Sequence, residues 1–166
     1  MKNIVLIGMP GCGKSTLGKL LAVELGRPFY DADTVLEERE GQTIRDLFAV
    51  SEDCFREAET RTVRYLAGLE GCVIAAGGGV VKRAENLAAL KAGSMIIFID
   101  RQPENIVLDI DIADRPLLQA GRQRIFDLYN ERVALYRRHQ EHTIDNNETP
   151  AAALAALVEL ARRECR

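Results

Sequence analysis

The sequence predicts an α/β fold built around a parallel β-sheet. Apolar segments typical of strands alternate with amphipathic segments typical of helices along the 166 residues. The strand segments are nearly continuous apolar runs, which indicates strands buried on both faces, as in parallel sheets. A glycine-rich turn joins the first strand directly to the first helix. The length fits one domain, which we expect to span residues 1–166.

Short apolar runs, bounded by glycines or polar turns, predict the strands. In chain order they lie at residues 2–7, 29–30, 72–76, 94–99 and 142–144. The first run is typical of a strand buried on both faces, and the fourth is almost purely apolar. The third ends at consecutive glycines, and the last is the weakest.

Helical spacing of apolar residues, together with capping signals, predicts the helices. They lie at residues 14–25, 31–40, 44–48, 52–69, 83–91, 103–109, 123–139 and 150–163. Thr43 and Asp46 resemble a capping box, Ser51 is a good N-cap for the helix that follows it, and Pro150 suits a first helical turn. Residues 109–121 show no steady period, and we expect a mobile loop there.

The composition argues against several classes of protein. A net charge of −3 and a pI of about 5.5 argue against bulk binding to nucleic acid or to an anionic membrane. No apolar run approaches the ~20 residues of a membrane span, and the four scattered cysteines lack metal-site spacing. We therefore expect a cytoplasmic protein with reduced thiols that binds neither nucleic acid nor membrane, and we expect a monomer.

Arginine dominates the basic residues, with 17 of the 22. The planar fork of donors on an arginine suits carboxylates and phosphates, so some of these residues could serve a small anionic ligand. Codon bias of the source genome is the simpler explanation of the surplus as a whole. The positions of individual arginines must decide between the two.

A phosphate-binding loop follows the first strand. Residues 8–15 (GMPGCGKS) fit the pattern G-x-x-x-x-G-K-[ST] between a buried strand and an amphipathic helix. Glycines let backbone N–H groups turn inward at a helix N-terminus, where they bind anionic oxygens. We expect Lys14 to reach the β- and γ-phosphates of ATP and the Ser15 hydroxyl to be a ligand of Mg²⁺. The predicted ATP contacts of this phosphate loop (residues 8–16) are Gly11, Cys12, Gly13, Lys14, Ser15 and Thr16.

Residues suited to a second substrate lie mainly at about 31–60. Asp31 and Asp33 follow the second strand, at the carboxyl end where open α/β sheets bind ligands. One carboxylate can hold Mg²⁺ through water while the other deprotonates an acceptor hydroxyl, although either could simply cap the next helix. Arg56 and Glu59 share a helix face, as a carboxylate receptor or as an ordinary surface ion pair. The glycines at 77–79 suit close approach of a ligand to the backbone or a tight turn.

Taken together, these motifs resemble one known family, the shikimate kinases, across essentially the whole chain. The phosphate loop alone is generic, and the joint occurrence is specific. The matching features are the phosphate loop, DAD at 31–33, the run from Ile44 to Glu59, the glycines at 77–79, RPLL at 115–118, and Arg132 with Tyr136. The resemblance implies a P-loop nucleoside-monophosphate-kinase-like three-layer sandwich, with a five-stranded parallel sheet flanked by helices and a mobile lid at about 109–121. It also implies transfer of the ATP γ-phosphoryl group to the 3-hydroxyl of shikimate, giving shikimate 3-phosphate and ADP in the aromatic amino-acid pathway.

The resemblance further implies roles for individual residues. Asp33 is expected to grip the acceptor hydroxyls and act as the base, with Asp31 holding Mg²⁺ through water. Arg56 and Arg132 would pair with the shikimate carboxylate, and Arg115 in the lid would meet the transferring phosphoryl group. The expected substrate-binding set is completed by Glu59, Gly77, Gly78 and Gly79. The expected catalytic residues are Lys14, Asp33 and Arg115.

The expected lid departs from the family pattern. Residues 107–114 carry three acids and no basic residue, where family members usually have several. Carboxylates near a polyphosphate are unfavourable unless they point away. Two alternatives therefore stay open. One is a related kinase acting on gluconate or a nucleoside monophosphate, which should lack the paired Arg56 and Arg132. The other is a non-catalytic nucleotide-binding relative, which the retained Lys14 and Asp33 argue against.

Overall fold

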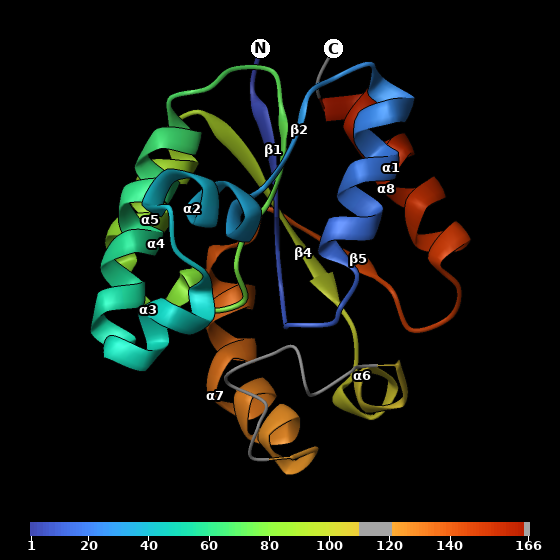
Figure 1. Ribbon diagram of the computed structural model, residues 1–166. Helices are drawn as coiled ribbons and strands as arrows, with labels where there is room; N and C mark the ends of the chain where they lie inside the picture. The colour runs from blue at the N-terminus through green and yellow to red at the C-terminus, as the bar shows by residue number, and fades with distance from the viewer. Residues whose placement is uncertain (110–120, 165–166) are drawn as a thin grey trace.

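Five parallel strands form the centre of the fold, in the order β2–β3–β1–β4–β5 (Figure 1). The computed structural model describes residues 1–109 and 121–164. The strands are β1 (Asn3–Ile7), β2 (Phe29–Asp31), β3 (Val73–Ala75), β4 (Ser94–Asp100) and β5 (His142–Asp145). All four neighbouring pairs run parallel, and β1 in the middle is buried along its whole length. The predicted five-stranded parallel sheet is confirmed.

Helices cover both faces of this sheet, which gives three layers. Figure 1 shows α1 and α8 together on one face and α4 and α5 on the other. The helices of the described residues are α1 (Lys14–Leu25), α2 (Ala32–Glu40), α3 (Ile44–Val50), α4 (Glu52–Ala67), α5 (Ala84–Lys91), α6 (Pro103–Asp109), α7 (Gln123–His139) and α8 (Pro150–Glu164), with a 3₁₀ turn η1 (Val80–Lys82). None of these helices is long and apolar enough to cross a membrane.

Local signals in the sequence set most helix boundaries. The Thr43 hydroxyl accepts a hydrogen bond from Asp46 N at 3.1 Å, and the Asp46 carboxylate accepts one from Thr43 N, so the predicted capping box at α3 is confirmed. Ser51 caps α4 through Cys54 N at 3.0 Å. Gly26 ends α1 with a left-handed φ of 63°, a conformation that favours glycine. The η1 turn was not predicted, because three residues are too few to show a period.

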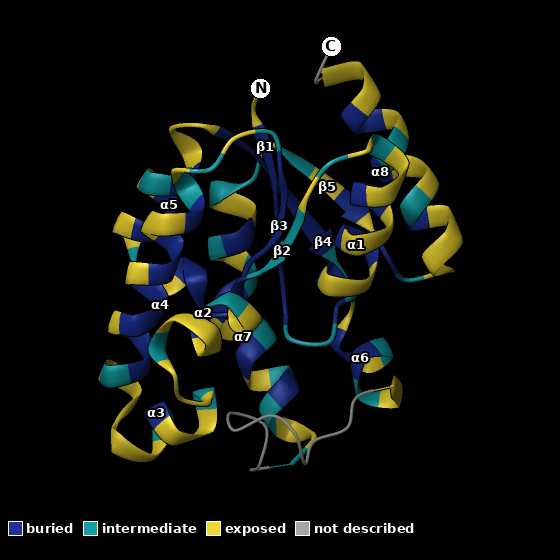
Figure 2. Ribbon diagram, turned by 45° about the horizontal axis from the view of Figure 1, so that its top comes forward, coloured by how far each residue is buried: buried dark blue, intermediate teal, exposed yellow. Residues whose placement is uncertain are grey.

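The apolar interior consists of two separate clusters. The main cluster surrounds the sheet, and Figure 2 shows β1, β3 and β4 buried and the outer helix faces exposed. A second cluster, which we call the small core, fills the space between α2, α3 and α4. Its buried members are Leu36, Leu47, Phe55 and Ala58. The stacked rings of Phe48 and Phe55, 4.4 Å apart, extend it toward the carboxyl ends of the strands.

Most of the arginines in ion pairs lie on the surface. Arg61 and Glu40 approach to 2.9 Å, and the Arg61 side chain is 53% exposed. Exposed pairs of this kind contribute little to stability. Of the arginines among the described residues, only Arg56 and Arg132 are buried. The arginine surplus is therefore mostly a surface feature, and two members of it need a different explanation.

Candidate active site

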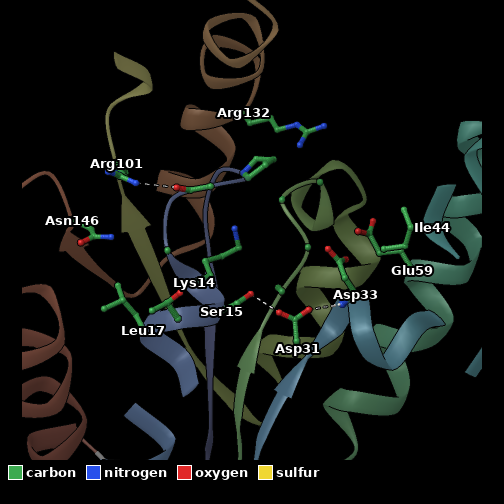
Figure 3. Close-up of a pocket in the computed structure, with 18 of the residues that line it drawn as sticks. Lys14, Ser15, Leu17, Asp31, Asp33, Ile44, Glu59, Arg101, Arg132 and Asn146 are labelled. Carbon is green, nitrogen blue, oxygen red and sulfur yellow. Dashed lines mark hydrogen bonds between the residues drawn. The ribbon is translucent and has the colours of Figure 1, made fainter. Parts of the chain in front are cut away.

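One cavity lies at the carboxyl ends of the strands, with a volume of about 770 Å³. All five strands contribute, because parallel strands end at the same edge of a sheet. Figure 3 shows side chains from these strand ends facing a common space. The strand-end contributions to the wall are the phosphate loop after β1, Asp31 and Asp33 at β2, Ala76 to Gly79 after β3, Arg101 after β4 and Asn146 after β5.

The phosphate loop forms the floor of the cavity. Gly8, Gly11 and Gly13 have φ values of 149°, 79° and 100°, in the region that glycine adopts without strain. Lys14 is buried, and its Nζ donates to Gly8 O and Met9 O at 2.8 Å each. The loop thus holds an ammonium group at its centre by means of its own carbonyl oxygens. A phosphate bound there would meet a cation that is already in place.

Cys12 is the one predicted loop contact that does not line the cavity. Its side chain is fully buried, with Sγ 3.6 Å from Lys14 Nζ. Its backbone N–H donates to Met9 O at 3.1 Å. The thiol and the backbone N–H of this residue therefore both contact other groups of the loop. The other predicted contacts, Gly11, Gly13, Lys14, Ser15 and Thr16, are all on the cavity wall.

Asp31 joins the phosphate loop to the next strand. One carboxylate oxygen accepts a hydrogen bond from the Ser15 hydroxyl. The other caps α2 by accepting from Asp33 N at 3.0 Å and Thr34 N at 3.4 Å. Of the two roles considered for this residue, capping of α2 is observed, and holding Mg²⁺ through water stays a prediction.

These oxygen atoms fit a hard divalent cation. Mg²⁺ prefers oxygen ligands and keeps several waters, so it commonly binds through one or two protein side chains and the substrate phosphates. Ser15 and Asp31 offer a hydroxyl and a carboxylate side by side. In residues 1–109 and 121–164 no group of three or more His, Cys, Asp or Glu could hold a metal by itself. A cation at this position would thus depend on the phosphates of a nucleotide.

On the opposite side of the cavity, Arg56 and Glu59 form a buried ion pair. Arg56 Nη1 lies 2.9 Å from Glu59 Oε1, and each side chain is 5% exposed. Glu52, itself 2.7 Å from Lys82 Nζ, contacts the same guanidinium at 3.4 Å. Burial raises the pKa of the Glu59 carboxyl, although Arg56 opposes this. The alternative of an ordinary surface pair is excluded by the burial.

The glycines after β3 leave room for these charged side chains. A Cβ on Gly79 would lie 2.2 Å from Arg56 Nη1, and one on Gly77 would lie 2.8 Å from Glu59 Oε2 and 3.2 Å from Asp33 Oδ1. A Cβ on Gly78 would lie 2.7 Å from Pro10 of the phosphate loop. Glycine is therefore required at each position because neighbouring groups approach the backbone closely, which goes beyond the needs of a tight turn.

Arg132 from α7 completes this end of the cavity. Its side chain is among the largest that are fully buried, and among the described residues Nε, Nη1 and Nη2 meet no hydrogen-bond partner. One turn further along α7, the Tyr136 hydroxyl donates to Gly78 O, and burial raises the pKa of that hydroxyl. A buried guanidinium without partners is costly in isolation, so the site is suited to an anion. The cavity wall thus brings together Asp33, Arg56, Glu59, Arg132 and the glycines, as predicted.

Part of the prediction lies outside the described residues. Arg115 and the expected lid at 109–121 fall there, apart from Asp109 at the end of α6 and Gly121 before α7. Asp109 is on the cavity wall, where its carboxylate pairs with Arg101.

Several residues of the cavity wall were assigned no individual role from the sequence. Arg101 and Asn146 directly follow β4 and β5, and Glu148 with Pro150 extends the same side. The general rule that ligands bind at strand carboxyl ends could have drawn attention to both strand ends. Arg101 belongs to no local motif, however, and only the strand order places β4 beside β1.

Comparison with known proteins agrees with this geometry. The model of the family described as "Shikimate kinase" matches residues 10–161. The chain is 47% identical to a shikimate kinase of Clostridium botulinum over 150 residues (90% of this chain, 91% of the relative). It is 49% identical to one of Clostridium beijerinckii over 148 residues (89% and 88%).

Solved structures point the same way. The shikimate kinase of Acinetobacter baumannii, described in complex with shikimate, superposes with a TM-score of 0.91 at 32% identity, covering 100% of this chain and 96% of that one. The Aquifex aeolicus enzyme gives a TM-score of 0.81 at 31% identity, covering 98% of each chain. With the family match over residues 10–161, these likenesses show that the chain belongs to the shikimate kinase family.

Proposed function

We propose that the cavity carries out the family's reaction with ATP at the phosphate loop and shikimate at the opposite end. As a shikimate kinase, the chain is an ATP-dependent enzyme that transfers a phosphoryl group to an alcohol, here the 3-hydroxyl of shikimate. One observation supports this division of the cavity into a nucleotide end and an acceptor end. Two buried arginines lie at the end away from Lys14, where a carboxylate would pair with both, and one of them meets no hydrogen-bond partner in residues 1–109 and 121–164.

At the nucleotide end, the loop binds the phosphates and Lys14 neutralises their charge. Lys14 Nζ is held 2.8 Å from two loop carbonyls, so little rearrangement is needed when the phosphates arrive. The backbone groups of Gly11, Gly13 and Thr16 provide further contacts. Ser15 would hold Mg²⁺ directly and Asp31 through water, and the bound ion would neutralise charge that develops on the phosphates.

At the acceptor end, Arg56 and Arg132 bind the shikimate carboxylate and Glu59 holds Arg56 in position. Gly77 to Gly79 offer backbone groups to the ring hydroxyls. Asp33, on the same wall, receives the proton of the attacking hydroxyl. Because phosphoryl transfer needs positioning and charge neutralisation more than covalent chemistry, these residues suffice for the acceptor side.

Some parts of the proposal rest on the family resemblance or on composition alone. Arg115 is assigned to the transferring phosphoryl group by resemblance. The net charge of −3 supports a protein that binds neither nucleic acid nor an anionic membrane. We further propose a cytoplasmic monomer whose kinase domain spans residues 1–166.

A coupled ADP-release assay tests this proposal. ATP with Mg²⁺ is offered together with shikimate, gluconate or a panel of nucleoside monophosphates, and each reaction is repeated with excess EDTA. We expect turnover with shikimate alone, lost with EDTA and restored by added Mg²⁺. Turnover confined to gluconate or a nucleotide would contradict the assigned acceptor. Binding of ATP without any turnover would favour a non-catalytic relative.

A further inference from the structure

Two side chains hold the phosphate loop from outside, and neither belongs to the loop motif. Arg101 Nη1 donates to Gly11 O at 3.3 Å, and Asn146 Nδ2 donates to Cys12 O at 2.8 Å. Figure 3 shows both side chains on the same side of the cavity as the loop, far along the sequence from it. We propose that Arg101 and Asn146 are positioning residues that keep the loop in its phosphate-binding conformation. This inference rests on the proposed binding of ATP phosphates at the loop.

The geometry of the peptide unit explains how such contacts act. The C=O of one residue and the N–H of the next share a plane and point in opposite directions in a trans peptide. Asn146 donates to the Cys12 carbonyl, so the N–H of the same peptide, which belongs to Gly13, points away from the Asn146 side chain. Arg101 holds the Gly11 carbonyl, while the N–H of the same peptide donates to Met9 O at 3.1 Å. Two successive peptide planes of the loop are thereby fixed.

Asn146 is built into a rigid position. Its backbone N–H donates to Asp100 O at 2.9 Å, which continues the pairing of β4 with β5, and its side chain is buried. The amide packs so closely on the loop that a Cβ on Gly13 would lie 2.7 Å from Nδ2. Gly13 also has a φ of 100°, so this glycine is required both by its backbone and by the amide beside it.

Arg101 adds a charged donor to the same loop. Its Nη2 pairs with the Asp109 carboxylate, so the guanidinium spans from the end of α6 to the phosphate loop. A cationic donor makes a stronger hydrogen bond to a carbonyl than a neutral one. The Arg101 side chain is on the cavity wall and 20% exposed, which also places a positive charge near the bound anion.

This role is tested by substitutions that remove the hydrogen-bond donor of a side chain but keep its approximate volume. Asn146→Leu keeps the approximate size of the amide and removes the donor without adding charge, and Asn146→Ala removes both. Arg101→Met keeps much of the stem, while Arg101→Lys restores a cationic donor. Asn147→Ala and Arg137→Ala are matched controls. Asn147 accepts from Gln102 N at 2.7 Å, Arg137 lies 3.8 Å from Asp100, and neither is on the cavity wall.

Calorimetric titration with ADP, with inorganic pyrophosphate and with shikimate provides the readout. We expect Asn146→Leu, Asn146→Ala and Arg101→Met each to weaken ADP and pyrophosphate by about ten-fold and to leave shikimate unchanged. Arg101→Lys should recover most of the affinity, and both controls should bind like wild type.

Two outcomes would overturn the inference. One is wild-type ADP affinity in Asn146→Leu and Arg101→Met. The other is a parallel loss of ADP and shikimate affinity, matched in the controls, which would mean general structural damage. A wild-type chain that bound shikimate but neither ADP nor pyrophosphate would instead overturn the proposed nucleotide end, and this inference with it.

Discussion

Arg56 Nη1 lies 2.9 Å from Glu59 Oε1, one turn along α4, and both side chains are almost completely buried. The other carboxylate oxygen, Glu59 Oε2, has no hydrogen-bond partner in the part of the chain that the structure describes. A buried ion pair stabilises a fold little by itself, since desolvation offsets the attraction between the charges. The pair lies on the same cavity wall as the equally buried Arg132, which supports its proposed role in binding an anion.

Arg56→Ala should weaken shikimate binding far more than ADP binding. Loss of one member of a desolvated charge pair costs about 2–5 kcal/mol in binding free energy. Titration of each variant with shikimate and with ADP measures both effects. Arg61→Ala is the matched control, because Arg61 lies on the same helix but pairs with Glu40 on the surface. Unchanged shikimate affinity in Arg56→Ala would remove this residue from the acceptor site.

Gly79→Ala should also weaken shikimate binding, although this substitution removes no charged group. The new methyl group would lie 2.2–2.6 Å from the Arg56 guanidinium and displace it. We expect shikimate affinity to fall by about 10- to 100-fold, the cost of moderate overpacking. Gly93→Ala is the control, since nothing lies within 4 Å of a Cβ there. Normal shikimate binding by Gly79→Ala would contradict this prediction, because it would mean that the Arg56 guanidinium can accommodate the methyl group without losing its contact with shikimate.

Asp33→Asn should lower kcat and leave nucleotide affinity nearly unchanged. A positioned general base contributes about 10²–10⁴-fold to the rate, and an amide cannot accept the proton from the attacking hydroxyl. Steady-state kinetics and ADP titration separate the two effects. Glu38→Gln, on the exposed part of the same helix, should behave like wild type. A normal kcat in Asp33→Asn would exclude this residue as the base.

Glu59→Gln should change how stability depends on pH. Burial raises the pKa of Glu59 above its ordinary value of 4.5, so the folded state binds this proton more tightly than the unfolded state. The carboxyl group therefore favours folding most below pH 4.5, and this contribution is lost as the pH rises through the folded pKa. Glutamine does not titrate, so the free energy of unfolding of Glu59→Gln relative to wild type should increase with pH over this window.

Urea unfolding of both proteins across the same pH series measures that difference. Glu85→Gln controls for loss of a carboxylate, because Glu85 makes an exposed pair with Arg64. A stability difference between Glu59→Gln and wild type that stayed constant from pH 4 to pH 8 would show that the Glu59 pKa is the same in the folded and unfolded states.

The helices and strands could be predicted almost entirely from the sequence, because their signals are local. Caps such as Thr43 with Asp46 act over three residues, and the buried strands are visible as apolar runs. The phosphate loop and Asp31 were likewise found from neighbouring residues. The i, i+3 spacing predicted that Arg56 would meet Glu59. It could not show that the pair is buried, because burial depends on the packing of the glycines after β3 against it.

The remaining part of the site depends on relationships between distant segments. Arg101 reaches Gly11 across 90 positions and Asn146 reaches Cys12 across 134. Only the order of strands in the sheet brings these groups together. No spacing or period in a single sequence records that order, which is why neither residue was assigned an individual role from the sequence.

The small core has a thermodynamic consequence. Leu36, Leu47, Phe55 and Ala58 are packed apart from the apolar residues around the sheet, so α2, α3 and α4 share a separate source of stability. Segments stabilised in this way open with their own, smaller free energy, and a ligand that contacts them raises it. Since Arg56 follows Phe55 directly on α4, occupation of the acceptor end is expected to slow the amide hydrogen exchange that proceeds by local opening of these three helices.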